Sequence, residues 1–175
     1  MDETSTNLWE RPRRIWQARG GIRVHKSTKQ GSNITIIGAL SHGKLFTKLV
    51  DGTTTDTIEA FFKAMAEEHN LFGNCIVLDN HTAHRSYAVQ DLFEELKCEL
   101  LFLPPATSIL NPIEVLWAHV KRKWRERLLL ANQGNVDRDW MVRELHEICN
   151  SFSEEELEKL AAAHYRDAIE LLNEF

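Results

Sequence analysis

Two short apolar runs with a helical segment between them constrain the fold of this chain more than any other feature. Residues 75–79 have the sequence CIVLD and residues 98–104 have the sequence CELLFLP. Continuous apolar runs of this length are typical of strands that are buried on both faces of a sheet. Residues 86–97 lie between them and have apolar side chains at helical spacing, at Tyr87, Val89, Leu92, Phe93 and Leu96. A strand, a helix and a strand in this order predict parallel pairing through a right-handed crossover.

A hairpin and a helix are predicted ahead of the first apolar run. Residues 33–40 and 44–50 are rich in strand-forming side chains and are joined by the turn sequence SHGK. Asp56, followed three residues later by Glu59, is typical of a helix start, and residues 57–70 continue with helical spacing. The hairpin adds antiparallel strands to the parallel pair. The predicted fold class is therefore α/β, a mixed sheet with helices on its faces.

The rest of the chain is predicted to be helical. Pro104 and Pro105 end the second apolar run, and residues 111–130 form a long helix. A loop and terminal helices follow. We expect one domain, with a core at residues 1–130 and a C-terminal helical extension of the same domain at residues 131–175.

Composition and charge narrow the classes of protein to which the chain could belong. No stretch approaches the roughly 18 consecutive apolar residues of a membrane helix, and no signal peptide is visible. The three cysteines are far apart and odd in number, which indicates reduced thiols in an intracellular protein. The net charge is −5, yet residues 11–29 and 121–127 are strongly basic. Such runs are ordinarily solvated faces, but two of them on an acidic chain indicate a local surface for a polyanion.

Two acidic residues lie where sheets of this kind collect their chemistry. Asp79 ends the first apolar run, so its carboxylate is expected at the carboxyl edge of the sheet. Glu114 follows Asn111, a good N-cap, and Pro112, which suits the first helical position. Each acid also has an ordinary explanation, because Asp79 with Asn80 suits a turn and Glu114 suits a capping box.

The long helix places Glu114 beside cations. Its apolar residues form one stripe, whereas Glu114 lies off that stripe on a line with Ala118, Lys121 and Arg125. A solvated polar face explains this row. A row of cations leading to an acid also suits a phosphate backbone that runs to a metal site.

The motifs around these acids resemble a known family. IVLDNHTAH at residues 76–84 and LFLPPATSILNPIEVLWAHVKR at residues 101–122 are similar to the catalytic core of mariner-like transposases, the Asp-Asp-Glu/Asp group with a ribonuclease-H-like fold. In this resemblance Asp79 matches the second acid and Glu114 the third, at a spacing that the family uses. His84 matches a histidine often found after the second acid.

The start of the chain extends the resemblance. MDETSTNLWERPRRIW resembles the stretch that begins at the family's Asp-Glu pair, which makes Asp2 the first acid. The resemblance then covers residues 2 to about 130 and implies the roles that follow. The catalytic and metal-binding residues are Asp2, Asp79 and Glu114, the DNA-binding residues are Arg11, Arg13, Arg14, Lys121 and Arg125, and the supporting residues are His84 and Asn80.

The resemblance also implies a chemistry and a location. Two Mg²⁺ or Mn²⁺ ions, roughly 3.5–4 Å apart, would lie between the three carboxylates and clamp a scissile phosphate. The implied activity cuts DNA at the ends of a mobile element and joins the freed 3′-hydroxyl to target DNA. The partners are DNA and, as an open expectation, a second copy of the chain, with no membrane. The location is the nucleus in a eukaryotic host and otherwise the cytoplasm or nucleoid.

Two departures from the family pattern keep alternatives open. The family places an apolar strand before the first acid, whereas only Met1 precedes Asp2. We therefore expect a truncated first strand, an open middle of the sheet and Asp2 on a fraying end. No helix-turn-helix region precedes the acids. A catalytically inactive DNA- or protein-binding module is the second hypothesis, and a ribonuclease-H-like nuclease that acts on RNA–DNA hybrids is the third.

Overall fold

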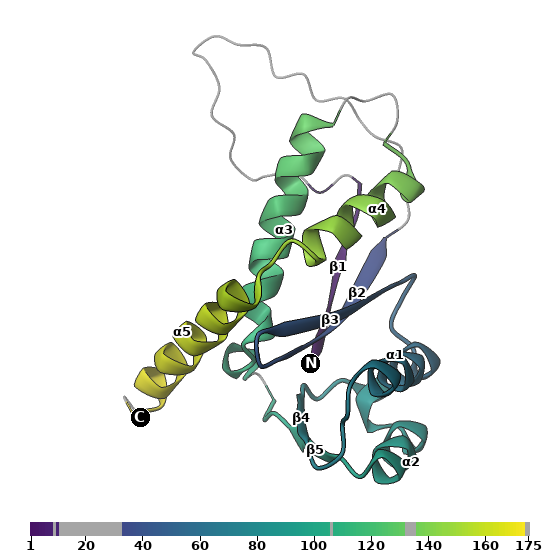
Figure 1. Ribbon diagram of the computed structural model, residues 1–175, viewed down its shortest axis with the longest axis vertical. Coiled ribbons are helices and arrows are strands. Elements are labelled where there is room, and N and C mark those ends of the chain that lie inside the picture. Colours follow the sequence, from purple (N-terminus) through teal and green to yellow (C-terminus); the bar gives the residue numbers. More distant parts are fainter. Residues whose placement is uncertain (9, 11–32, 106, 132–135, 174–175) are drawn as a thin grey trace.

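In its described residues, the computed structural model contains five strands and five α-helices (Figure 1). The structure describes residues 1–8, 10, 33–105, 107–131 and 136–173. The strands are β1 Asp2–Thr6, β2 Ile34–Ser41, β3 Lys44–Val50, β4 Cys75–Leu78 and β5 Glu99–Phe102. The helices are α1 Thr55–Glu68, α2 Tyr87–Leu96, α3 Ile113–Leu130, α4 Arg138–Cys149 and α5 Glu154–Asn173, with short 3-10 helices η1 Thr82–Arg85 and η2 Ser108–Leu110.

The strands form two separate sheets. One has the order β1-β2-β3 and is antiparallel, and the other is the parallel pair β4-β5. The predicted hairpin and the predicted parallel pair are therefore both confirmed. The gap between the sheets confirms the expected open middle. The N-terminal amino group of Met1 donates a hydrogen bond of 2.9 Å to the backbone oxygen of Val77, which joins β1 to β4 across this gap.

The hairpin turns at His42 and Gly43, which both have positive φ, at 46° and 71°. This backbone suits a tight two-residue turn between twisted strands. A Cβ on Gly43 would lie 2.9 Å from Cγ of Glu158 and 3.0 Å from the backbone oxygen of Glu154. The turn therefore packs against the first turns of α5, and glycine is required there for both its conformation and its size.

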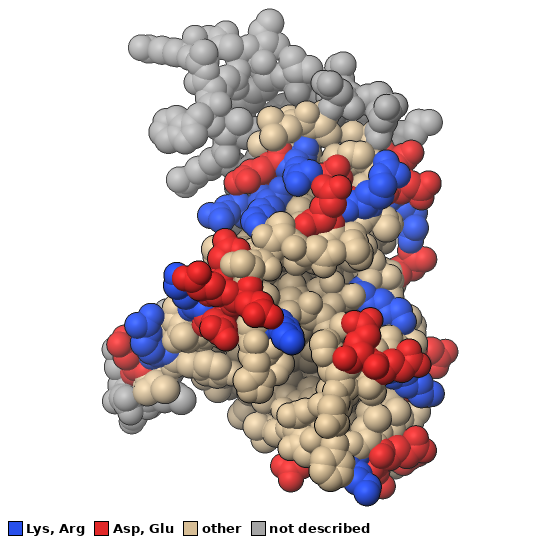
Figure 2. All heavy atoms as spheres, viewed as in Figure 1, with Lys and Arg blue, Asp and Glu red and all other residues tan. Residues whose placement is uncertain are grey.

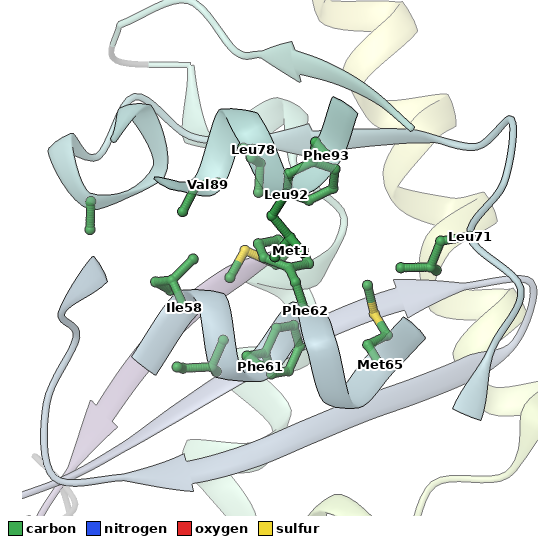
Figure 3. Close-up of a cluster of buried hydrophobic side chains, with 12 residues drawn as sticks. Met1, Ile58, Phe61, Phe62, Met65, Leu71, Leu78, Val89, Leu92 and Phe93 are labelled. Atoms are coloured by element: carbon green, nitrogen blue, oxygen red, sulfur yellow. The ribbon is translucent and has the colours of Figure 1, made fainter. Parts of the chain in front are cut away.

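Two hydrophobic clusters lie on opposite faces of the three-stranded sheet. Side chains alternate along a strand, so Ile37 of β2 faces one cluster and Ile34 and Ile36 face the other. The first cluster joins Met1 and β4 to α1 and α2, and Figure 3 shows its aromatic centre. There Phe62 of α1 meets Phe93 of α2 edge-on, with ring centroids 4.5 Å apart. The second cluster joins the sheet to α3 and α4.

Several local expectations are corrected by the packing. The capping box of α1 is formed by Thr54 and Thr57, not by Asp56 and Glu59, because the helix begins earlier than predicted. Tyr87, placed on the apolar face of α2 by its spacing, is the first residue of the helix and is 85% exposed.

The strands β4 and β5 are not buried on both faces. Ile76, Leu100 and Phe102 pack against the first cluster, whereas Cys75 and Leu101 point to the opposite face and are exposed. An apolar run without alternation cannot by itself tell a strand covered on one face from a strand covered on both.

The expectation that Asp2 lies on a fraying end is wrong. Residues 2–6 form β1, Asp2 pairs with Gly38 of β2, and the Asp2 side chain is buried. The first acid thus stands at the start of a strand and not at its end. Antiparallel pairing along all of β1 holds it in place.

Replacing Phe62 by alanine should destabilise the fold by about 3–5 kcal/mol, because the ring is fully buried between α1 and α2. Phe72→Ala is the matched control, since that ring is 66% exposed and should change stability by less than about 0.5–1 kcal/mol. Urea unfolding followed by circular dichroism measures both. Equal losses in the two variants would contradict the packing described.

Candidate active site

The Asp-Glu pair of β1 places its two carboxylates on opposite faces of the sheet. Because side chains alternate along a strand, Asp2 faces α3 and Glu3 faces η1. Nε1 of Trp117 in α3 donates a hydrogen bond of 3.0 Å to Oδ2 of Asp2. Oε1 of Glu3 lies 2.7 Å from Nε2 of His84 in η1. The strand therefore presents one acid on each face of the sheet.

Asp79 follows the last residue of β4, as predicted from the apolar run. Its Oδ1 accepts a hydrogen bond of 3.0 Å from the backbone N–H of His81, which is the turn explanation of this residue. The same oxygen lies 2.9 Å from Nδ1 of His84. The side chain is still 40% exposed. A turn role and a place in a site are thus compatible for Asp79.

Asn80 supports this turn from the next position. Its Nδ2 donates a hydrogen bond of 2.6 Å to the backbone oxygen of Leu103, just after β5, and its Oδ1 accepts one from Arg85. Asn80 therefore connects the ends of β4 and β5 beside Asp79.

Glu114 lies in the first turn of α3, as predicted. The capping-box alternative does not occur, because the backbone N–H of Asn111 donates to the oxygen of Ser108 at 2.8 Å. The Asn111 side chain is buried, and its Nδ2 donates a hydrogen bond of 3.2 Å to the backbone oxygen of Met1. This contact fixes the start of α3 against the start of β1, which brings Glu114 to the same region as Asp2.

Burial is the largest cause that raises the pKa of Asp2, which reaches about 7. A hydrogen bond from the backbone of Glu3 lowers it, whereas the charges of Glu114, Glu3 and Asp79 add to the increase. Glu3, Asp79 at the end of β4 and Glu114 at the start of α3 are thus close enough to Asp2 for their charges to act on it. Nearby carboxylates repel one another when they are ionised, and this repulsion raises the pKa of the group that is most affected.

The potential metal ligands of this region are not equally close to one another. Glu3, Asp79 and His84 offer potential ligand atoms that all lie within 4.8 Å of one another. Among the described residues, Asp2, Asp79 and Glu114 do not form a group that compact. The structure therefore groups Asp79 with His84 and Glu3, and the charge of Asp79 also acts on Asp2.

His84 is completely buried between two acids. Burial alone would lower its pKa, but the hydrogen bond to Glu3 and the charges of Glu3 and Asp79 together raise it above its ordinary value. Nδ1 of His84 lies in direct contact with Asp79. The contact with Glu3 was not predicted, because nothing in the sequence relates residues from β1 and η1.

Trp117 and Gly38 form a further support that the sequence pattern did not reveal. Gly38 is the pairing partner of Asp2 in β2, and a Cβ at Gly38 would lie 2.5 Å from Cη2 of Trp117. The absence of a side chain thus lets the indole approach the sheet and reach Asp2. A glycine inside a strand indicates that another group approaches the backbone closely, so the sequence did contain a signal for this contact.

The residues predicted to bind DNA differ in their structural environments. Arg11, Arg13 and Arg14 lie outside the described residues. Lys121 is half-buried on α3. Nε and Nη2 of Arg125 lie 3.1 and 2.9 Å from Oε1 of Glu10, so a phosphate would compete with this pair.

Charge on the visible face is mixed. Figure 2 shows Lys and Arg side chains interspersed with Asp and Glu on that face, without one continuous basic surface. Within the basic run of α3, Arg127 pairs with Glu144 and Glu147 of α4, and Nζ of Lys123 lies 4.0 Å from the ring centroid of Phe152. Part of this run therefore attaches the C-terminal helices to α3.

The described residues form an α/β fold that carries an acid on β1, another directly after β4 and a third in the first turn of α3. The chain belongs to the DDE superfamily endonucleases, whose family model matches residues 1–137. No curated protein sequence matches it significantly.

Solved structures share the fold. The crystal structure of the Mos1 mariner paired end complex with Mn is 15% identical, with a TM-score of 0.69 over 94% of this chain and 51% of that chain. The Mos1 strand transfer complex is 16% identical, with a TM-score of 0.52 over 93% of this chain and 53% of that chain. The chain spans about half the length of these chains. The predicted ribonuclease-H-like fold is confirmed by this likeness. Among the described helices, none is long and apolar enough to cross a membrane.

Gly38→Ala should destabilise the fold by about 1–3 kcal/mol, because the new methyl group would overlap the rigid ring of Trp117. Gly52→Ala is the matched control, since a Cβ at Gly52 meets nothing within 4 Å. Thermal unfolding measures both variants. Similar melting temperatures for the two would rule out the close approach of Trp117 to β2.

Asp2→Asn should stabilise the metal-free protein at alkaline pH. The folded state holds the pKa of Asp2 near 7, above its ordinary 3.8, so ionised Asp2 opposes folding. This cost is absent below about pH 4 and grows by about 1.4 kcal/mol per pH unit until about pH 7. Urea unfolding of both proteins at pH 4, 6 and 8 measures the difference. Equal stabilities at pH 8 would show that Asp2 is not buried among negative charges.

Proposed function

We propose that the chain is the catalytic domain of a DNA transposase, which cuts DNA strands at mobile-element ends and transfers the freed 3′-hydroxyl to target DNA. The observation that carries the proposal is the buried carboxylate of Asp2 under the influence of Glu114 and Asp79. Membership in the DDE superfamily endonucleases supports the same class of reaction. One solved Mos1 structure is a transposase paired-end complex with the left transposon end, which favours DNA as the partner.

The side chains fit a pair of divalent cations. The donors are carboxylate oxygens, which Mg²⁺ and Mn²⁺ prefer. Burial, and after it the charges of Glu114, Glu3 and Asp79, raise the pKa of Asp2, and bound cations would stabilise its ionised form. We propose Asp2, Asp79 and Glu114 as the residues that hold two Mg²⁺ or Mn²⁺ ions. One relative, the Mos1 paired end complex, was crystallised with Mn.

Bound ions would activate a water or a 3′-hydroxyl for in-line attack and stabilise the leaving oxygen of the phosphodiester. The protein's own contribution is to position the three acids. Trp117 orients Asp2 through its indole N–H, and Asn111 ties the helix of Glu114 to the start of β1. The turn at His81 orients Asp79. Lys121 and Arg125 would bind the phosphate backbone, with Arg125 exchanging Glu10 for phosphate.

An inactive DNA- or protein-binding module is the second candidate. The observation that favours it is the gap in the sheet, which places Asp2 and Asp79 on different sheets. The DNA-dependent function would place the protein in the nucleus of a eukaryotic host or with a bacterial nucleoid. Transposases join two DNA ends, so a homodimer is part of the proposal.

Asp79→Asn should reduce Mn²⁺- or Mg²⁺-dependent cleavage of duplex DNA by at least about 100-fold, because an amide is a poor ligand for these ions. DNA binding should change by less than about threefold. Asp91→Asn, on the exposed face of α2, is the matched control and should keep full cleavage. Gel assays with labelled duplex DNA and with an RNA–DNA hybrid measure both reactions.

The outcomes separate the candidates. No cleavage by the unaltered chain with either ion, together with retained DNA binding, would support the inactive module. Preferred cleavage of the hybrid would support a ribonuclease-H-like nuclease. Full cleavage by Asp79→Asn would remove Asp79 from the site.

A further inference from the structure

His84 has a ring nitrogen whose environment is unusual. Its side chain is 0% exposed, and Nε2 makes a contact of 2.7 Å with Glu3. Nδ1 lies 2.9 Å from Oδ1 of Asp79, but this contact lacks the alignment of a hydrogen bond. Within the described part of the chain, Nδ1 is therefore a buried polar atom without a hydrogen-bond partner. Such atoms are rare because they cost free energy, so this one requires a physical explanation.

The separation and the misalignment both fit two ligands of one metal ion. Neighbouring ligands on an octahedral ion, each about 2.1 Å from it at a right angle, are separated by about 3 Å and do not point at one another. Nδ1 of His84 and Oδ1 of Asp79 are related in this way.

The contact of Nε2 of His84 with Glu3 also fits a histidine that binds a metal ion. A histidine that binds a metal through one nitrogen commonly donates the other N–H to a carboxylate, which fixes its tautomer and orientation. Glu3 has this relation to His84 through Nε2. Glu3 can contact His84 while Asp2 contacts α3, because side chains alternate along β1 and the two residues lie on opposite faces of the sheet.

We propose that His84 Nδ1 and Asp79 Oδ1 together bind a divalent transition-metal ion and that Glu3 orients the imidazole. The inference rests on the proposed function, because Asp79 is also one of the three acids assigned to the ion pair. A nitrogen ligand moves the preference of this position from Mg²⁺ toward ions such as Mn²⁺ and Zn²⁺. The two ions of the site would then differ in their ligands, with an oxygen-only position near Asp2 and Glu114 and a mixed position at Asp79 and His84.

The direct test uses Mn²⁺ as the probe on the full chain. Electron spin echo modulation detects nitrogen-14 bound to Mn²⁺, so the unaltered protein should show the signal of a coordinated imidazole. His84→Gln should lose this signal and weaken Mn²⁺ binding by about 10-fold or more, with Mg²⁺ binding changed by less than about threefold. Glu3→Gln should keep the signal and weaken Mn²⁺ binding by about 10-fold.

Two controls make the result specific. His42→Asn removes an exposed histidine in the turn between β2 and β3, outside the site, and it should keep the signal. Circular dichroism reports whether His84→Gln folds. If it does not, the signal in the unaltered protein and in Glu3→Gln still decides the question.

The possible failures are distinguishable. Mn²⁺ that binds without a nitrogen signal, and is lost in Asp79→Asn, would overturn the histidine ligand and leave the proposed function standing. His84 would then be an imidazolium held between Glu3 and Asp79. Mn²⁺ that binds equally well to Asp79→Asn would overturn the proposed function itself.

Discussion

The hydrogen bond from Trp117 to Asp2 ties together the parts on which the proposed site depends. It connects the first strand to the helix that carries Glu114, one turn before the tryptophan. Asp2 is buried, and the neighbouring acids raise its pKa, so it would lower its free energy by turning to solvent. The indole donor and the pairing of β1 with β2 hold it in place. Gly38 makes this possible by leaving room for the ring.

The gap between the two sheets determines how rigidly the acids are held relative to one another. In a continuous sheet, backbone hydrogen bonds would fix β1 against β4. Here Met1 supplies one such bond, and the contact of the Glu3 side chain with His84, which in turn lies against Asp79, supplies a second link. Side-chain contacts are less rigid than a ladder of backbone hydrogen bonds, so we expect the distance between Asp2 and Asp79 to respond to bound cations. Bound cations would draw together carboxylates that repel one another when no cation is bound.

Much of the fold could be predicted from the local sequence. The hairpin, α1, α2 and the parallel pair follow from periodicity and turn residues, and those signals act over a few residues. The errors share a different cause. The capping residues of α1, the exposure of Tyr87 and the uncovered face of β4 and β5 depend on where an element begins or on what packs against it. Asp2 was expected on a fraying end because its pairing with Gly38 joins residues far apart in the chain.

For the site, the sequence by itself determined the residue types and their places on elements: an acid after β4, an acid in the first turn of α3, and an Asp-Glu pair near the start. These follow from the strand and helix signals next to each acid and from the motifs around them. Only the tertiary structure decided which groups meet. Glu3 contacts His84, Asp2 contacts Trp117, and Arg125 contacts Glu10. The physical reason is that alternation along a strand chooses the face of a side chain, whereas its partner depends on how remote elements pack, which no local pattern encodes.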